Sequence, residues 1–195
     1  ANDERLAVGM EMFQRPFQSA LDRYGRGELP EEDFLKASEY LQRWGFAWSL
    51  YRPIVEFSRK NHVPIAALNV PRELTQRLAK VGHDGLTKEE KAQLGDIDFH
   101  VKAHRDHWFE RLAKLHGKAD IPQEQKERSY QVMAAWDGYM AASAAAFQKE
   151  RNVRRMVILA GSGHIDRGFG IPTRIAKLTG GKVATVRIEV GAVAA

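Results

Sequence analysis

The sequence has no cysteine, and this absence excludes disulfide bonds, thiolate metal sites and a cysteine nucleophile. It also has no apolar run near the roughly 20 residues that a membrane-spanning helix needs, and its first residues lack the pattern of a signal peptide. Neither a polybasic run nor a familiar nucleic-acid-binding motif is present, so no nucleic-acid partner is expected. The 30 Lys and Arg against 25 Asp and Glu give a net charge of +5, which slightly favours an anionic ligand or a membrane surface.

Short β-prone runs alternate with helical segments in the first and last parts of the chain. Apolar runs over residues 6–12, 63–69 and 153–159 each lead into a turn and then a helix, and a last run covers residues 183–190. Repeated strand and helix units of this kind predict an α/β fold with a mostly parallel sheet flanked by helices. Because the chain enters a strand almost at once, we expect a further segment upstream of this sequence.

The middle of the chain contains no strand-like run and is predicted to be helical. The expected helices cover residues 87–94, 101–115 and 122–150. Thr87 and Glu90 can form a capping box at the start of the first one. The sequence therefore predicts a small all-helical lobe, residues 82–150, inserted into an α/β core domain made of residues 1–81 and 151–195.

Polar residues stand where the predicted strands end. Glu11 lies near the carboxyl end of the first strand, Asn69 ends the second, and His164 follows the third. Since parallel strands end at the same edge of a sheet, we expect these side chains to converge on one crevice. A carboxylate inside a buried strand is costly unless it is paired or bound, so Glu11 is either a site residue or half of a structural salt bridge. Gln18, on the next helix, is expected close to Glu11.

His164 stands in the glycine-rich turn AGSGHIDRGFG. Glycines allow a sharp turn and keep other side chains away, so we expect His164 to face a ligand rather than only to hydrogen-bond the turn. Arg167 and Arg174 flank the start of a helix near Pro172. Guanidinium groups beside a helix N-terminus favour a carboxylate or a phosphate as the ligand.

The predicted helix over residues 122–150 carries a broad apolar stripe in which Asp137 is the lone acid. Tyr130, Met133 and Met140 recur in this stripe at steps of three and four residues. Such a stripe is ordinarily core, yet it would also suit a flat apolar ligand held against the edge of the sheet. The pattern alone leaves both interpretations open.

Three histidines, His100, His104 and His107, are spaced so that they share one helical face. Histidines four residues apart can chelate a metal, but no carboxylate spacing such as HExxH accompanies them. A solvated or partner-facing helix surface is the favoured interpretation of this cluster.

Four segments carry a resemblance to a known family. They are GMEMFQRPFQ at residues 9–18, YRPIVEF with PIAALNVPREL across residues 51–74, WDGYMA at residues 136–141, and LAGSGHIDRGFGIPTRI at residues 159–175. In this order they resemble the ChaN family of haem-binding uptake lipoproteins, which is similar to a wider group with the Tiki, TraB and erythromycin-esterase families. Family members usually start with a strand carrying a GExHDN-like motif, and this sequence lacks that motif and a lipobox cysteine.

The resemblance implies an iron-regulated, membrane-anchored or periplasmic protein of the cell envelope, tethered through an N-terminal segment that is missing here. It also implies haem, bound in a homodimer with a tyrosine on the iron and basic or histidine side chains on the propionates. Three tyrosines, Tyr130, Tyr139 and Tyr51, are candidates for the iron ligand, because no motif fixes the choice.

By the same resemblance, Glu11 matches the family's strand-end acid, Asp137 its lobe-helix acid and His164 its glycine-turn histidine. Arg167 and Arg174 match its basic tail. Gln18 and Asn69 are further candidates for contact with the cofactor.

Two classes of function follow from these residues. The first is a haem-binding protein of an uptake system, with haem between the sheet edge and the helical lobe. The alternative is a hydrolase in which Glu11, Asp137 and His164 manage a water or a divalent metal, with Glu11 and His164 as metal ligands. We favour haem binding because of the family resemblance. A sheet domain whose site has decayed after the loss of its first strand is a third interpretation.

Overall fold

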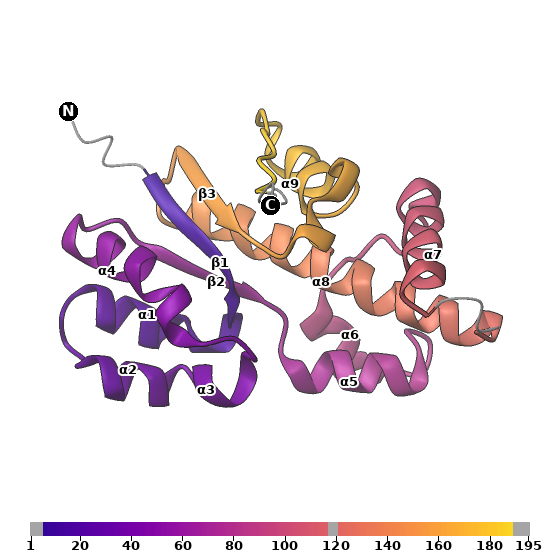
Figure 1. Cartoon of the computed structure of the whole chain (residues 1–195), viewed down its shortest axis with the longest axis horizontal. Coiled ribbons are helices and arrows are strands. Elements are labelled where there is room, and N and C mark those ends of the chain that lie inside the picture. The colour runs from indigo at the N-terminus through magenta and orange to yellow at the C-terminus, as the bar shows by residue number, and fades with distance from the viewer. Residues whose placement is uncertain (1–5, 117–120, 189–195) are drawn as a thin grey trace, which may run out of the picture.

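A small parallel sheet with helices on both faces forms the left half of the molecule, and a group of helices extends from it on the right (Figure 1). The computed structural model describes residues 6–116 and 121–188. The strands are β1 (Leu6–Gln14), β2 (Ile65–Asn69) and β3 (Arg155–Leu159). Both β2 and β3 pair with β1 in parallel, which gives the order β2-β1-β3. The predicted α/β class with a parallel sheet flanked by helices is confirmed.

The helices occur largely where the apolar periodicity predicts them. They are α1 (Gln18–Gly25), α2 (Glu31–Ala37), α3 (Tyr40–Arg43), α4 (Arg52–Lys60), α5 (Arg72–Val81), α6 (Lys88–Leu94), α7 (Lys102–His116), α8 (Gln123–Glu150) and α9 (Ile171–Thr179), with short 3-10 turns η1 (Arg15–Phe17), η2 (Trp48–Leu50), η3 (Ser162–His164) and η4 (Asp166–Gly168). The capping box of Thr87 and Glu90 forms at the start of α6 as predicted. None of the helices in the described part of the chain has the length and apolar character needed to span a bilayer.

Alternation along β1 sends successive side chains to opposite faces of the sheet. Val8, Met10 and Met12 pack on one face among buried residues from α1 to α4. On the other face, Ala7 packs with apolar residues of the second half of α8 and of α9. Glu11 is an odd-numbered position like Ala7, so its side chain points toward the face that α8 covers. The strand pattern therefore aims this carboxylate at α8.

A third cluster of buried residues joins α5, α6 and the first half of α8. Tyr130 and Ala134 of α8 belong to this cluster, whereas Met140 and Phe147 of the same helix belong to the cluster on the sheet. One continuous helix thus contributes to both the sheet packing and the helical group. The proposed division between a core domain and a lobe at residue 150 stays a prediction.

Two details differ from the predicted elements. Residues 183–188 form no strand, and Val186 and Ile188 are 79% and 90% exposed, so their alternating apolar side chains have no surface to pack against; residues 189–190 lie outside the described residues. The acidic residues after Pro30 and the glycine at Gly45 suggest the start and end of one helix, but this segment is divided into α2 and α3, because Glu39 adopts a left-handed backbone conformation with φ of 49°.

Candidate functional site: a buried line of acids and histidines

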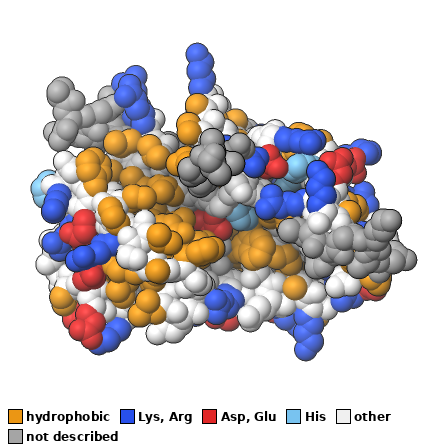
Figure 2. Space-filling model, viewed as in Figure 1, with side chains coloured by type: hydrophobic (Ala, Val, Ile, Leu, Met, Phe, Trp, Pro, Cys, Tyr) orange, Lys and Arg blue, Asp and Glu red, His pale blue; other side chains and the backbone are white. Residues whose placement is uncertain are grey.

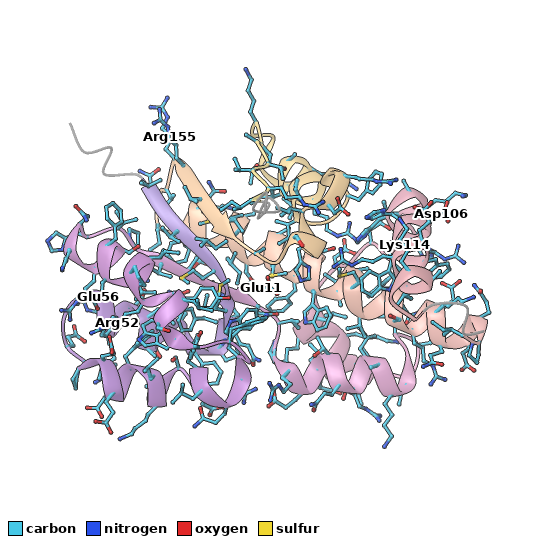
Figure 3. The ribbon with its side chains drawn as sticks, viewed as in Figure 1. Glu11, Arg52, Glu56, Asp106, Lys114 and Arg155 are labelled. Carbon is cyan, nitrogen blue, oxygen red and sulfur yellow. The ribbon has the colours of Figure 1, made fainter. Side chains whose placement is uncertain are left out.

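The register of the sheet places Glu11 beside the ends of both neighbouring strands. Met10 pairs with Leu159, so Glu11 lies next to the turn that follows β3. The Oε2 atom of Glu11 accepts a hydrogen bond of 2.6 Å from the backbone N–H of Gly161. Its backbone carbonyl accepts one of 2.9 Å from Nδ2 of Asn69. Figure 3 shows Glu11 near the middle of the molecule, where the sheet ends and the right-hand helices begin.

The imidazole of His164 lies between two carboxyl groups. Its Nε2 atom is 3.2 Å from Oε1 of Glu11, and its Nδ1 atom is 2.7 Å from Oδ1 of Asp137, which α8 contributes. The exposed fractions of Glu11, His164 and Asp137 are 8%, 8% and 0%. The structure therefore brings together the three residues that the sequence singles out. Each nitrogen of the imidazole contacts a carboxyl group.

His104 on α7 extends this line by one more residue. Its Nε2 atom is 3.3 Å from Oδ2 of Asp137, but the two atoms are poorly aligned, and Oδ2 has no hydrogen-bond partner within residues 6–116 and 121–188. The Nδ1 atom of His104 is buried without a partner as well. Burial lowers the pKa of His104 to about 4, and the nearby charges of Arg174 and His107 act in the same direction. His104 is therefore a neutral imidazole at neutral pH.

Burial and pairing set the pKa values of the other three groups. Burial by itself would lower the pKa of His164, but Asp137 and Glu11 outweigh it and raise that pKa to about 10. Burial would raise the pKa of Glu11, but the hydrogen bonds from His164 and Gly161 bring it below its usual value. At Asp137 burial dominates over the contact with His164 and raises the pKa. His164 is thus an imidazolium held between two carboxyl groups at neutral pH.

The position of Gly170, just before α9, requires a glycine because the backbone there lies against His164 and Asp137. A Cβ atom there would lie 2.2 Å from the backbone carbonyl oxygen of His164 and 2.8 Å from Oδ2 of Asp137. Real Cβ atoms do not approach other atoms so closely. The glycine therefore lets the start of α9 pack directly against the buried acid.

Gln18 and Asn69, two predicted cofactor contacts, have partners within the protein. The side-chain amide of Gln18 donates a hydrogen bond of 2.8 Å to the carbonyl of Ile65 and accepts one of 2.8 Å from the N–H of Ala67. Gln18 therefore pairs with the edge of β2 that faces away from β1. Asn69 donates to Glu11, and its Oδ1 atom is buried without a partner. Asn69 lies beside the buried line, and Gln18 lies along β2.

The two predicted arginines lie at different depths. Arg167 on η4 is exposed, and its Nη1 atom is 4.0 Å from Oε2 of Glu110 on α7. Arg174 on α9 is half-buried and donates a hydrogen bond of 3.2 Å to the backbone carbonyl of Asp98. Burial raises the pKa of Tyr130, and Arg174 opposes that effect through its charge and a hydrogen bond. Arg174 is therefore the arginine that approaches the buried groups.

The three candidate tyrosines have different surroundings. Tyr130 is 1% exposed, and its hydroxyl donates 3.2 Å to the carbonyl of Val101. Tyr51 is half-buried in an aromatic cluster, with ring centroids 6.4 Å from Tyr40 and 6.3 Å from Trp44. Tyr139 on α8 is half-buried, and its hydroxyl makes no hydrogen bond to any residue that the structure describes.

A cavity of ≈ 770 Å³ lies among α5, α7 and the first half of α8. Trp108, Val132 and Trp136 form apolar parts of its wall, and Arg128 lines it as well. Trp136 also meets the edge of His164, with ring centroids 6.1 Å apart and an angle of 89° between the rings. One side chain therefore connects the wall of this cavity with the buried line.

A family model described as "Haem-binding uptake, Tiki superfamily, ChaN" matches residues 1–175. This chain belongs to the ChaN family. The match covers the sheet, the helical group and the glycine turn with its histidine. The resemblance read from the four sequence segments is confirmed at the level of the family.

A solved structure with the same fold is described as "Cofacial heme binding to ChaN of Campylobacter jejuni". The two chains share 20% sequence identity with a TM-score of 0.64, and the similarity covers 88% of this chain and 62% of the other. The present ChaN-family chain thus spans about 62% of the length of that protein. Among curated proteins, no match to this chain is found.

The acids and histidines of the buried line in this ChaN-family chain pair with one another, and a metal held by Glu11 and His164 stays a prediction. In residues 6–116 and 121–188, no group of three or more histidine and acidic side chains is placed to hold a metal ion. Glu11 and His164, the predicted metal ligands, are paired with each other. The metal-binding interpretation of His100, His104 and His107 gains no support either, because His104 faces Asp137 and His107 Nε2 lies 2.9 Å from Oδ2 of Asp166. The solvated surface favoured for this cluster is wrong for His104, which is 3% exposed.

Two residues of this site were not assigned to it from the sequence. His104 is recognisable as part of a histidine face, but its contact with Asp137 depends on how α7 packs on α8. Gly170 stands in a glycine-rich turn, yet only the close approach of α9 to Asp137 explains why that position needs a glycine.

Proposed function

We propose that this protein binds haem as part of a haem-uptake system. The observation that carries the proposal is the match of the haem-binding uptake family to residues 1–175. The ligand would lie where the helical group meets the sheet edge, with one side near the cavity of Trp108 and Trp136. The stripe of Tyr130, Met133 and Met140 on α8 is core, since these side chains are 1%, 4% and 0% exposed, so the apolar surface for the ligand is that of the cavity wall.

The cavity fits a flat apolar cofactor in size and chemistry. Its volume of ≈ 770 Å³ lies within the range of about 300–1,000 Å³ that is usual for ligand pockets. Trp108, Val132 and Trp136 offer apolar surface for a macrocycle. A larger cavity of ≈ 940 Å³ lies beside β3, but its lining includes no tyrosine or tryptophan.

Tyr139 is the tyrosine whose surroundings best suit an iron ligand. It follows Val132 and Trp136 on the same face of α8, at steps of four and three residues. Among the residues that the structure describes, its hydroxyl has no hydrogen-bond partner, whereas that of Tyr130 donates to Val101. Burial raises the pKa of Tyr139, and the charge of Arg15 opposes this effect, so Arg15 favours the tyrosinate form. Haem, when bound, would supply a ferric iron, and the hydroxyl oxygen of Tyr139 would hold it in the tyrosinate form.

The location in the cell envelope and a homodimer complete the proposal. The family's description as an uptake protein supports the first. Exposed apolar side chains support self-association, since contiguous apolar surface often marks an interface. Leu50, Phe57 and Val157 are 61%, 59% and 55% exposed, and Figure 2 shows apolar side chains gathered on the left half of this face. Size measurement with and without hemin tests whether haem drives dimer formation.

The ligand assignment is tested by three variants, Tyr139→Phe, Tyr130→Phe and Tyr51→Phe, each saturated with hemin. Tyr139→Phe should lose a tyrosinate-to-iron charge-transfer band in the visible spectrum, because it alone lacks the ligand oxygen. The other two should keep the wild-type spectrum. If Tyr139→Phe keeps the band and another variant loses it, the choice of Tyr139 is wrong.

A further inference from the structure

Arg111 lies on the face of α7 that is turned toward the buried line. It follows His104 by seven residues and His107 by four, a spacing that places all three side chains on one face of a helix. His104 reaches Asp137 and His107 reaches Asp166, so this face is directed at α8 and at the segment after β3. Figure 1 shows α7 in the right-hand part of the molecule, beside α8.

The guanidinium of Arg111 lies against the glycine turn that carries His164. A Cβ atom built on Gly163 would be 3.5 Å from Cζ and 3.5 Å from Nη2 of Arg111, and 3.4 Å from Cε of Met133. These are ordinary van der Waals distances, so they place the guanidinium directly beside the turn. Met133 belongs to the apolar stripe of α8, so the charge of Arg111 lies at the border between that stripe and the turn.

Arg111 has no counter-charge in the part of the chain that the structure describes. Other arginines nearby are engaged: Arg105 pairs with Glu127, Arg167 is close to Glu110, and Arg174 donates to the carbonyl of Asp98. Asp166 on η4 is already paired with His107. The Arg111 side chain is only partly exposed. A half-buried cation without a partner is unfavourable for the protein alone, and a bound anion would remove that cost.

We propose that Arg111 and the Gly163 turn form a carboxylate subsite, which in haem would take a propionate. This inference rests on the proposed function for the identity of the ligand. A guanidinium presents parallel N–H donors that match the two oxygens of a carboxylate. Met133, which is 4% exposed, is buried beside the turn and forms an apolar border to the guanidinium. Neither Arg167 nor Arg174 combines these features, since the first is exposed and the second is engaged with Asp98.

The test compares hemin with hemin dimethyl ester, in which the propionate charges are absent. Arg111→Gln should weaken hemin binding by roughly 10- to 100-fold, as expected for loss of a charge-assisted hydrogen-bonded pair. It should leave the affinity for the dimethyl ester unchanged. Lys114→Gln, which removes the same charge from an exposed position on α7, is the matched control and should alter neither affinity. Equal weakening of both ligands by Arg111→Gln, or no weakening of either, would overturn the subsite.

A second measurement separates this subsite from haem binding itself. At constant ionic strength, acetate should raise the melting temperature of the wild-type protein and not that of Arg111→Gln, while in chloride Arg111→Gln should melt no lower than the wild type. The same measurement with inorganic phosphate in place of acetate distinguishes a carboxylate subsite from a general anion site. Stabilisation by phosphate without stabilisation by acetate, or equal stabilisation of both proteins by acetate, would overturn the carboxylate assignment. If acetate acts as expected but hemin does not bind, the subsite stands and the haem proposal fails.

Discussion

The Nδ1 atom of His164 and the Oδ1 atom of Asp137 lie 2.7 Å apart, although one comes from a turn and the other from the middle of a helix. Asp137 is completely buried, and the other nitrogen of His164 faces Glu11. The imidazolium therefore neutralises charge at the point where β1, α8 and the turn after β3 meet. Removing it would leave two carboxyl groups in a site with little access to water.

His164→Ala should destabilise the fold by about 3–5 kcal/mol, the range seen when one partner of a buried ion pair is removed. Urea unfolding at neutral pH measures the change. His100→Ala is the control, because His100 is exposed and only its backbone N–H makes a hydrogen bond among the described residues, so the loss should be within about 0.5 kcal/mol. An unchanged unfolding midpoint for His164→Ala would show that the buried line does not stabilise the protein.

The stability should fall as the pH rises through the range in which His164 loses its proton. The pKa of His164 is raised from 6.5 to about 10, so the folded protein holds this proton more tightly than the unfolded chain. The stabilisation is complete below pH 6.5 and is lost as the pH approaches 10. The free energy of unfolding, measured from pH 6 to 10, should decline less steeply in His164→Gln than in the wild type. Parallel curves would contradict the pairing of His164.

Gly170→Ala should destabilise the protein by more than about 2 kcal/mol, because the added methyl group would overlap a backbone oxygen and the Asp137 carboxylate. Thermal unfolding measures the effect. Gly45→Ala is the matched control, since nothing lies within 4 Å of a Cβ at that position. The control should lose no stability. A Gly170→Ala variant as stable as Gly45→Ala would mean that α9 does not pack closely on the buried acid.

Gln18→Ala should cost about 1–3 kcal/mol, since it leaves the N–H of Ala67 and the carbonyl of Ile65 without their partner. Chemical denaturation compares it with Gln76→Ala, which changes an exposed glutamine on α5. The affinity of Gln18→Ala for hemin is measured as well. A loss of affinity with no loss of stability would restore Gln18 as a cofactor contact and contradict its role along β2.

Much of the fold could be predicted because local sequence carries the relevant signals. Alternation and β-branched residues locate the strands, apolar periodicity locates α7 and α8, and parallel strands place Glu11 and the turn before His164 at one edge. The run over residues 183–190 shows the limit of such signals. Its alternation suits a strand, but a strand also needs a partner and an apolar surface, and residues 183–188 have neither in this structure.

The partners of the site residues could not be predicted, because they depend on packing between distant elements. Glycines around His164 suggest an open imidazole, whereas Glu11 and Asp137 both contact it. Gln18 lies near Glu11 in sequence, yet the turn of η1 directs its amide to β2. Arg111 attracts no notice in the sequence, since only the position of α7 beside the Gly163 turn reveals it.

An equilibrium titration of the wild-type protein with hemin, followed by absorbance in the Soret region, tests haem binding by this chain. Binding to a defined site predicts a saturable spectral change with a fixed ratio of haem to protein, and a visible spectrum typical of tyrosinate-ligated ferric haem. A parallel titration of an unrelated protein corrects for nonspecific adsorption. A change that never saturates, or that matches the unrelated protein, would contradict haem binding by this chain.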